Sequence, residues 1–125
     1  MPVLLRQLPK LAKIAVLTYD STHLGEDLLG VDDPAERSRI VIGGLEGSKF
    51  WYDELKRPTP PTDISVLEAD VAACVERLRV AHPEIAALLF ECTVFPMVAP
   101  AIRDITKLPV YDIIGLARMM LASVA

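Results

Sequence analysis

The chain has 125 residues, of which 52% are hydrophobic, and a net charge of −4 from 13 Lys and Arg against 17 Asp and Glu. This length predicts one domain over residues 1–125, and the acidic balance without a basic block argues against nucleic acid as a partner. The two cysteines lie far apart and no signal peptide precedes them, which predicts reduced thiols in a cytoplasmic protein.

The first elements follow from short apolar patterns. Apolar residues at helical spacing predict a short amphipathic helix within residues 3–11. The continuous apolar run 13–18 has the length of a strand that is covered on both faces. Candidate N-caps at 19–21 then predict a helix over about 22–29, with Gly30 as its end.

The middle of the chain predicts a second strand and the best helix. Residues 38–43 read as a strand, and Gly43 with Gly44 closes it, as in a turn that needs positive φ. A short helix follows at about 49–56. The next helix is capped by Asp63 or by a capping box at 65–68, and it ends at 82. Its apolar stripe includes Cys74, which we interpret as a buried core residue.

The last third repeats the alternation of strand and helix. Strands are expected at 85–91 and 108–111, and helices at about 96–105 and 113–124. The order predicts an α/β fold, a four-stranded parallel sheet with helices on both faces. Charged residues interrupt the apolar tail, so no membrane span is expected.

Cys92 is the candidate catalytic residue because it directly follows the third predicted strand. The carboxyl ends of parallel strands are where ligands bind in open α/β sheets. Unpaired N–H groups of the next helix would lie beside the thiol and lower its pKa from about 8.5 to roughly 3.5–7.5. The alternative is a buried cysteine at a strand end without any chemical role.

The residues around Cys92 resemble a known family. The resembling segments are Ile14–Ser21, Val41–Glu46, Glu91–Pro96 with Ala99–Ile102, and Leu108–Ile113. Together they are similar to the C-terminal lobe of the aspartate/glutamate/hydantoin racemase superfamily. Two departures stand out, because Met97-Val98 replaces a common Pro-Tyr pair and Lys107 replaces a Gly. The chain also lacks the first of the two lobes of that family.

The resemblance implies proton transfer at carbon between two thiols, with no cofactor and no metal. Cys92 would be one of the two catalytic thiols, and Thr93, Thr18 and Glu91 would bind the substrate, a small amino acid or carboxylate. Each of the three also has a plainer interpretation. Thr93 caps a helix, Thr18 ends a strand, and Glu91 faces solvent.

Two functions therefore remain open at this stage. The first is a cofactor-independent racemase or isomerase represented by one lobe. The second is a catalytically inactive half, or an assembly or binding module, that lacks the second thiol. A flavodoxin-like or receiver-like domain fits the alternation but lacks the phosphate loop or acidic cluster that such domains need.

The apolar faces also imply a partner. We expect a homo-oligomer, or a missing N-terminal lobe, to cover the N-terminal stripe and the last helix. The residues expected in that contact are Leu4, Leu8, Ile113, Leu116 and Met120.

Overall fold

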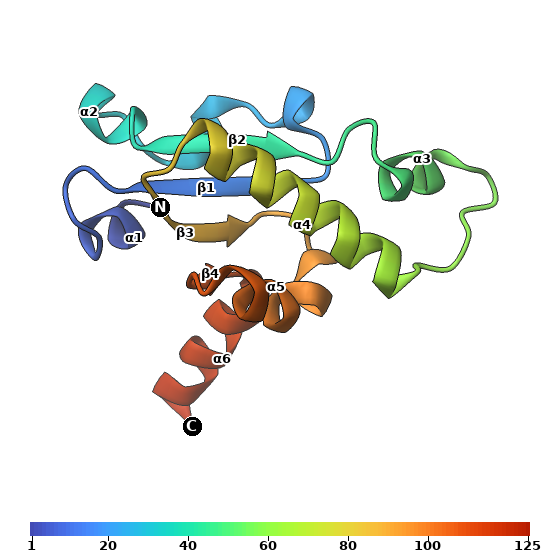
Figure 1. Ribbon diagram of the computed structural model, residues 1–125. Helices are drawn as coiled ribbons and strands as arrows, with labels where there is room; N and C mark the ends of the chain where they lie inside the picture. The colour runs from blue at the N-terminus through green and yellow to red at the C-terminus, as the bar shows by residue number, and fades with distance from the viewer.

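The computed structural model describes residues 1–125 and contains one four-stranded parallel sheet (Figure 1). Its strands are β1 Lys13–Thr18, β2 Ile40–Gly44, β3 Ile85–Phe90 and β4 Val110–Tyr111. They lie in the order β2-β1-β3-β4, and each neighbouring pair is parallel. The predicted α/β class is confirmed.

Helices and short 3₁₀ turns connect the strands. The helices are α1 Pro2–Arg6, α2 Pro34–Arg37, α3 Lys49–Leu55, α4 Ile64–Ala81, α5 Ala99–Thr106 and α6 Ile113–Val124, and the 3₁₀ turns are η1 Ser21–His23, η2 Glu26–Leu29 and η3 Phe95–Val98. The helix predicted at 22–29 is therefore wrong. Leu24 and Gly25 have extended backbone between η1 and η2, and this extension separates two short turns where one helix was expected.

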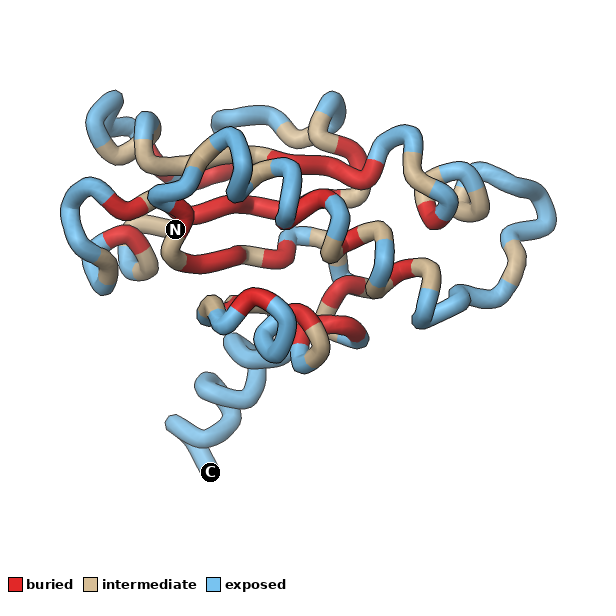
Figure 2. Tube along the Cα trace, viewed as in Figure 1, coloured by how far each residue is buried: buried red, intermediate tan, exposed pale blue.

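Two apolar clusters cover the two faces of the sheet. Buried residues run along the central strands (Figure 2). The larger cluster holds 16 buried residues and packs α4, η3 and α5 against residues such as Ala15, Leu17 and Leu88. The smaller joins Leu5 of α1 to Ile14, Val31 and Ala87. Successive residues of a strand point to opposite faces, so β1 and β3 each contribute to both clusters.

Helix α4 forms as its stripe predicts, but it has a simpler cap. The Asp63 carboxylate accepts hydrogen bonds from the amides of Ser65 at 3.0 Å and Val66 at 3.4 Å. No bond joins the Glu68 side chain to Ser65, so the predicted capping box is absent. Cys74 is fully buried among the core residues of α4, which confirms its interpretation as core.

Gly43 and Gly44 are needed for close approach, and the predicted positive-φ turn at these residues is wrong. Both lie inside β2, and neither has a positive φ. A Cβ on Gly43 would lie 2.5 Å from Leu78 Cδ1, and one on Gly44 would lie 2.5 Å from the Ser21 amide nitrogen and against the Glu46 carboxylate. The first glycine lets α4 pack on the sheet, and the second lets the loops after β1 and β2 meet.

Helix α6 leaves the body of the molecule (Figure 1) and contains no buried residue. It occupies the predicted residues 113–124. None of the helices combines the length and the apolar character that crossing a membrane requires.

Candidate active site at the carboxyl edge of the sheet

The strand order singles out the carboxyl ends of β1 and β3, which are neighbours in the sheet. From β1 the chain moves outward to β2 on one side, and from β3 it moves outward to β4 on the other. The strand order therefore reverses between β1 and β3, and ligands of open α/β sheets bind at such reversal points, beyond the carboxyl ends of the strands. Thr18 is the last residue of β1 at this reversal point, and Glu91 and Cys92 directly follow β3.

A hydrogen bond joins the side chains of Thr18 and Glu91, at the ends of the neighbouring strands β1 and β3. The Thr18 hydroxyl donates a hydrogen bond to Glu91 Oε2 at 2.6 Å, and the Glu91 amide donates to the Leu17 carbonyl at 2.9 Å. Thr18 is buried, while Glu91 is exposed. By strand alternation both side chains lie on the face of the smaller cluster, with Ile14. Thr93 lies exposed beyond them.

Cys92 lies on the opposite face, so the predicted site residues are not all brought together. Its half-buried side chain packs against the larger cluster, as does Tyr19. Burial raises the pKa of the thiol above its ordinary value, and the charge of Glu91 adds to this, while amide N–H groups of Val94 and Phe95 work against it.

The predicted lowering of the Cys92 pKa is therefore wrong. The expected helix start at 96 is η3, a turn of four residues, and its two N–H contacts do not offset the loss of hydration. The group is a neutral thiol near neutral pH.

An aromatic cluster that includes Tyr19, whose pKa is raised by burial and in part by the charge of Cys92, was not predicted as part of the site. The rings of Tyr19 and Trp51 stack with centroids 6.5 Å apart, and the Trp51 and Tyr52 rings meet edge to face at 5.0 Å. The Tyr19 hydroxyl donates to the Trp51 carbonyl at 2.9 Å, and Trp51 Nε1 donates to Asp20 Oδ2 at 3.1 Å. The signal in the sequence was the aromatic run 50–52, which lies within the short helix predicted at about 49–56.

Carboxylates outnumber cations at this edge. The Asp20 pKa is lowered, chiefly by the Thr22 hydroxyl, which donates to it at 2.5 Å, so Asp20 is ionised. The Tyr19 pKa is raised by burial and then by the charges of Glu54 and Asp20, while Arg57 acts in the other direction. Glu54 also raises the Cys92 pKa, which puts this carboxylate near both groups. The surroundings of the thiol therefore suit a cation better than an anion.

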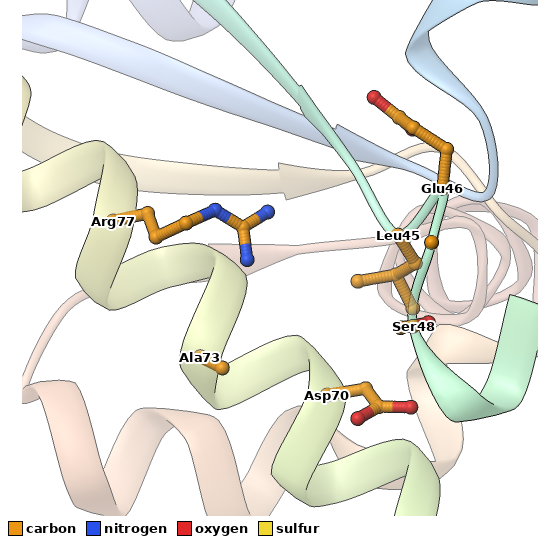
Figure 3. Close-up of a pocket in the computed structure, with 7 residues that line it drawn as sticks. Leu45, Glu46, Ser48, Asp70, Ala73 and Arg77 are labelled. Carbon is orange, nitrogen blue, oxygen red and sulfur yellow. The ribbon is translucent and has the colours of Figure 1, made fainter.

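A separate groove lies between the β2–α3 loop and α4 (Figure 3). It encloses about 310 Å³ and is lined by Leu45, Glu46, Gly47, Ser48, Asp70, Ala73 and Arg77. Asp70 accepts from the Phe50 amide at 2.8 Å, and Arg77 donates to the Gly44 carbonyl at 3.3 Å. These polar groups brace α3 and β2 against α4, and none of the predicted site residues lines the groove. No group of three or more His, Cys, Asp or Glu side chains is placed to hold a metal ion.

Comparison with known proteins changes the functional prediction. No family model and no solved structure matches the chain. The chain is 30% identical over 107 residues to a dimethylsulfoniopropionate lyase from Durusdinium sp. clade D, a match that covers 82% of this chain and 35% of that protein. The chain thus spans about a third of the length of this relative.

The predicted racemase or isomerase function, in its active or its inactive form, is contradicted by this relative, because a lyase is a different activity. The resemblance to the racemase superfamily itself stays a prediction, as do the site roles of Cys92, Thr93, Thr18 and Glu91. The chain is similar over most of its length to part of a lyase.

Proposed function

We propose that this chain carries the proton-abstracting thiol of a lyase that eliminates a leaving group β to a carboxylate. The substrate class would be that of dimethylsulfoniopropionate, which the name of the relative gives. The observation that carries the proposal is the position of Cys92, half-buried beyond β3 at the reversal of strand order, in a chain similar to that lyase.

The elimination needs one base and one leaving group. The Cys92 thiolate would take the proton from the carbon next to the carboxylate. The electron pair of that C–H bond forms the new C=C bond, and the pair of the C–S bond leaves with sulfur. The products are dimethyl sulfide and acrylate, and the proton on Cys92 returns to water. No electrons are gained or lost overall, so no redox partner is required.

The surroundings of the thiol support a sulfonium substrate. A sulfonium group is a cation, and cations are attracted to the faces of Trp and Tyr rings. Tyr19 offers such a ring near Cys92, with Trp51 stacked on it, and the Glu54 carboxylate adds negative charge. The same charges disfavour substrates with a second carboxylate.

The raised pKa of Cys92 sets the expected pH dependence. Because the thiolate is the base and its pKa is raised by burial, the rate should still be rising with pH beyond the ordinary pKa of a cysteine thiol. A thiol base must also stay reduced, so the proposal requires a reducing compartment, for which we propose the cytoplasm.

The test is release of dimethyl sulfide from dimethylsulfoniopropionate, followed by gas chromatography. Wild-type chain should release it, and Cys92→Ala should reduce the rate by about 100-fold or more, because general bases contribute roughly 10²–10⁴. Cys74→Ala is the matched control, since it removes the other thiol, which is buried in the core, and should keep the rate of the folded protein.

Two results would overturn the proposal. One is a wild-type chain, folded by circular dichroism, that releases no dimethyl sulfide between pH 7 and pH 10. The other is a Cys92→Ala protein that retains the wild-type rate.

A further inference from the structure

Helix α6 carries an apolar stripe that the rest of the chain leaves largely exposed to water. Its residues are Ile113, Leu116, Met120, Leu121 and Val124, whose exposed fractions are 50%, 46%, 60%, 66% and 82%. Figure 2 shows the whole helix exposed, beyond the edge of the sheet. Water-exposed apolar side chains in this number require an explanation.

The spacing places these five side chains on one face of the helix. They follow each other at intervals of three, four and one residues, the pattern of a helix that packs against a second helix. Arg118 is the one charged residue of α6 and lies on the other side, where Met119 and Ala122 also lie.

We propose that α6 is a self-association surface and pairs antiparallel with α6 of a second copy of this chain. A two-fold axis between residues 118 and 119 would set Ile113 against Val124 of the second copy and Leu116 against its Leu121. The small Ala117 would face the long Met120, and the two Arg118 side chains would point outward, so that like charges are kept apart.

The exposed area is adequate for a dimer. The stripe exposes on the order of 600 Å², which is the upper end for the largest apolar patch of a typical monomer. Two such stripes would bury up to about 1,200 Å², which is the lower end for specific, stable interfaces. Binding of α6 to a membrane surface explains the stripe less well than pairing does. Helices that lie on membranes carry many Lys and Arg on the polar face, and α6 has a single Arg.

Sedimentation velocity over a range of concentrations tests the pairing. Wild-type chain should sediment as a reversible dimer, and Met120→Glu should weaken the dimer by about tenfold or more, because a charge cannot be buried there without a partner. Met119→Glu is the matched control. It adds the same charge to an equally exposed methionine of the same helix, outside the stripe, and should leave the dimer unchanged.

Cross-linking tests the orientation, in a Cys92→Ser background that leaves Cys74 buried. In the antiparallel pair, cysteines introduced by Ala117→Cys lie near the axis and should form a disulfide between copies. Those introduced by Ile113→Cys lie about 16 Å apart along the helix and should not. A monomer at every concentration, equal weakening by Met120→Glu and Met119→Glu, or cross-linking at position 113 but not 117 would overturn the proposal. So would a wild-type chain that binds lipid vesicles and does not dimerise.

Discussion

The Thr18 hydroxyl donates to Glu91 Oε2 at 2.6 Å and so ties the ends of β1 and β3 at the point where the strand order reverses. Thr18→Val keeps the shape of the side chain and removes the donor. We expect it to lower the free energy of unfolding by about 1 kcal/mol, the net value of one hydrogen bond. Urea denaturation measures this.

The control for this link is Thr18→Ser, which keeps the hydroxyl and loses one methyl group. It should retain the bond to Glu91 and lose less stability than Thr18→Val. The opposite order would mean that the methyl group, packed in a buried position, matters more than the bond.

Gly44→Ala should destabilise the fold. The added Cβ would meet the Ser21 amide nitrogen at 2.5 Å and push against the Glu46 carboxylate, which accepts from that same amide at 3.0 Å. Because one obstacle is backbone, we expect a loss of about 1–3 kcal/mol in thermal or urea unfolding.

Gly115→Ala provides the contrast. A Cβ there meets only Asp112 Oδ1, at 3.6 Å, and alanine favours helix over glycine by about 1 kcal/mol. It should leave stability unchanged or raise it, as seen in the helical signal of circular dichroism. Equal losses from both changes would contradict the close approach at Gly44.

Lys107→Gly should stabilise the protein. Lys107 follows α5 with a φ of 59°, the left-handed conformation, and its amide donates to the Arg103 carbonyl at 2.8 Å. A side chain in this conformation costs about 1–2 kcal/mol, partly offset by the greater freedom of glycine when unfolded. We expect a net gain of about 0.5–1 kcal/mol from urea unfolding. A loss would show that the Lys107 side chain makes a stabilising contact of its own.

Glu54→Gln should make Cys92 more reactive. The Glu54 charge raises the pKa of the thiol, so removing it lowers the pKa and increases the thiolate fraction below that pKa. Alkylation by iodoacetamide at pH 8 should therefore be faster than in the wild type, because the thiolate is the form of the cysteine that reacts. For every variant the rate should rise with pH until the pKa is passed.

The matched control is Glu84→Gln. Glu84 precedes β3 at the other end of the strand and pairs with Lys13 at 2.6 Å, far from the thiol. Alkylation of Cys92 should proceed in this variant as in the wild type. An equal increase in both variants would mean that general loosening, and not the Glu54 charge, controls the thiol.

Local patterns were sufficient for the strands and the longest helices. The apolar run Lys13–Thr18 forms β1 with the predicted bounds, and α6 spans Ile113–Val124 as expected. Both predictions are correct because a continuous apolar run and a helical periodicity can be recognised from residues that are close together in the sequence. The helix predicted at 22–29 is wrong because N-cap candidates alone do not determine whether a helix continues. Gly25 takes an extended conformation in the middle of the segment.

The chemistry of the site depended on contacts that sequence patterns do not contain. The bond from Trp51 to Asp20 joins residues 31 positions apart, and it forms only when α3 is placed beside the end of β1. For the same reason the pKa of Cys92 was predicted in the wrong direction. The nearby helix start was visible in the sequence, while the burial that outweighs it arises from packing against the larger cluster.

Glu91 and Cys92 are consecutive, yet they belong to opposite faces of the sheet. A molecule bound against the sulfur therefore contacts the face of the larger cluster, while the Glu91 carboxylate is held on the other face by Thr18. Substitutions around Cys92 and the aromatic rings can therefore change the chemistry on one face of the sheet. They would leave the hydrogen bond between Thr18 and Glu91 on the other face in place.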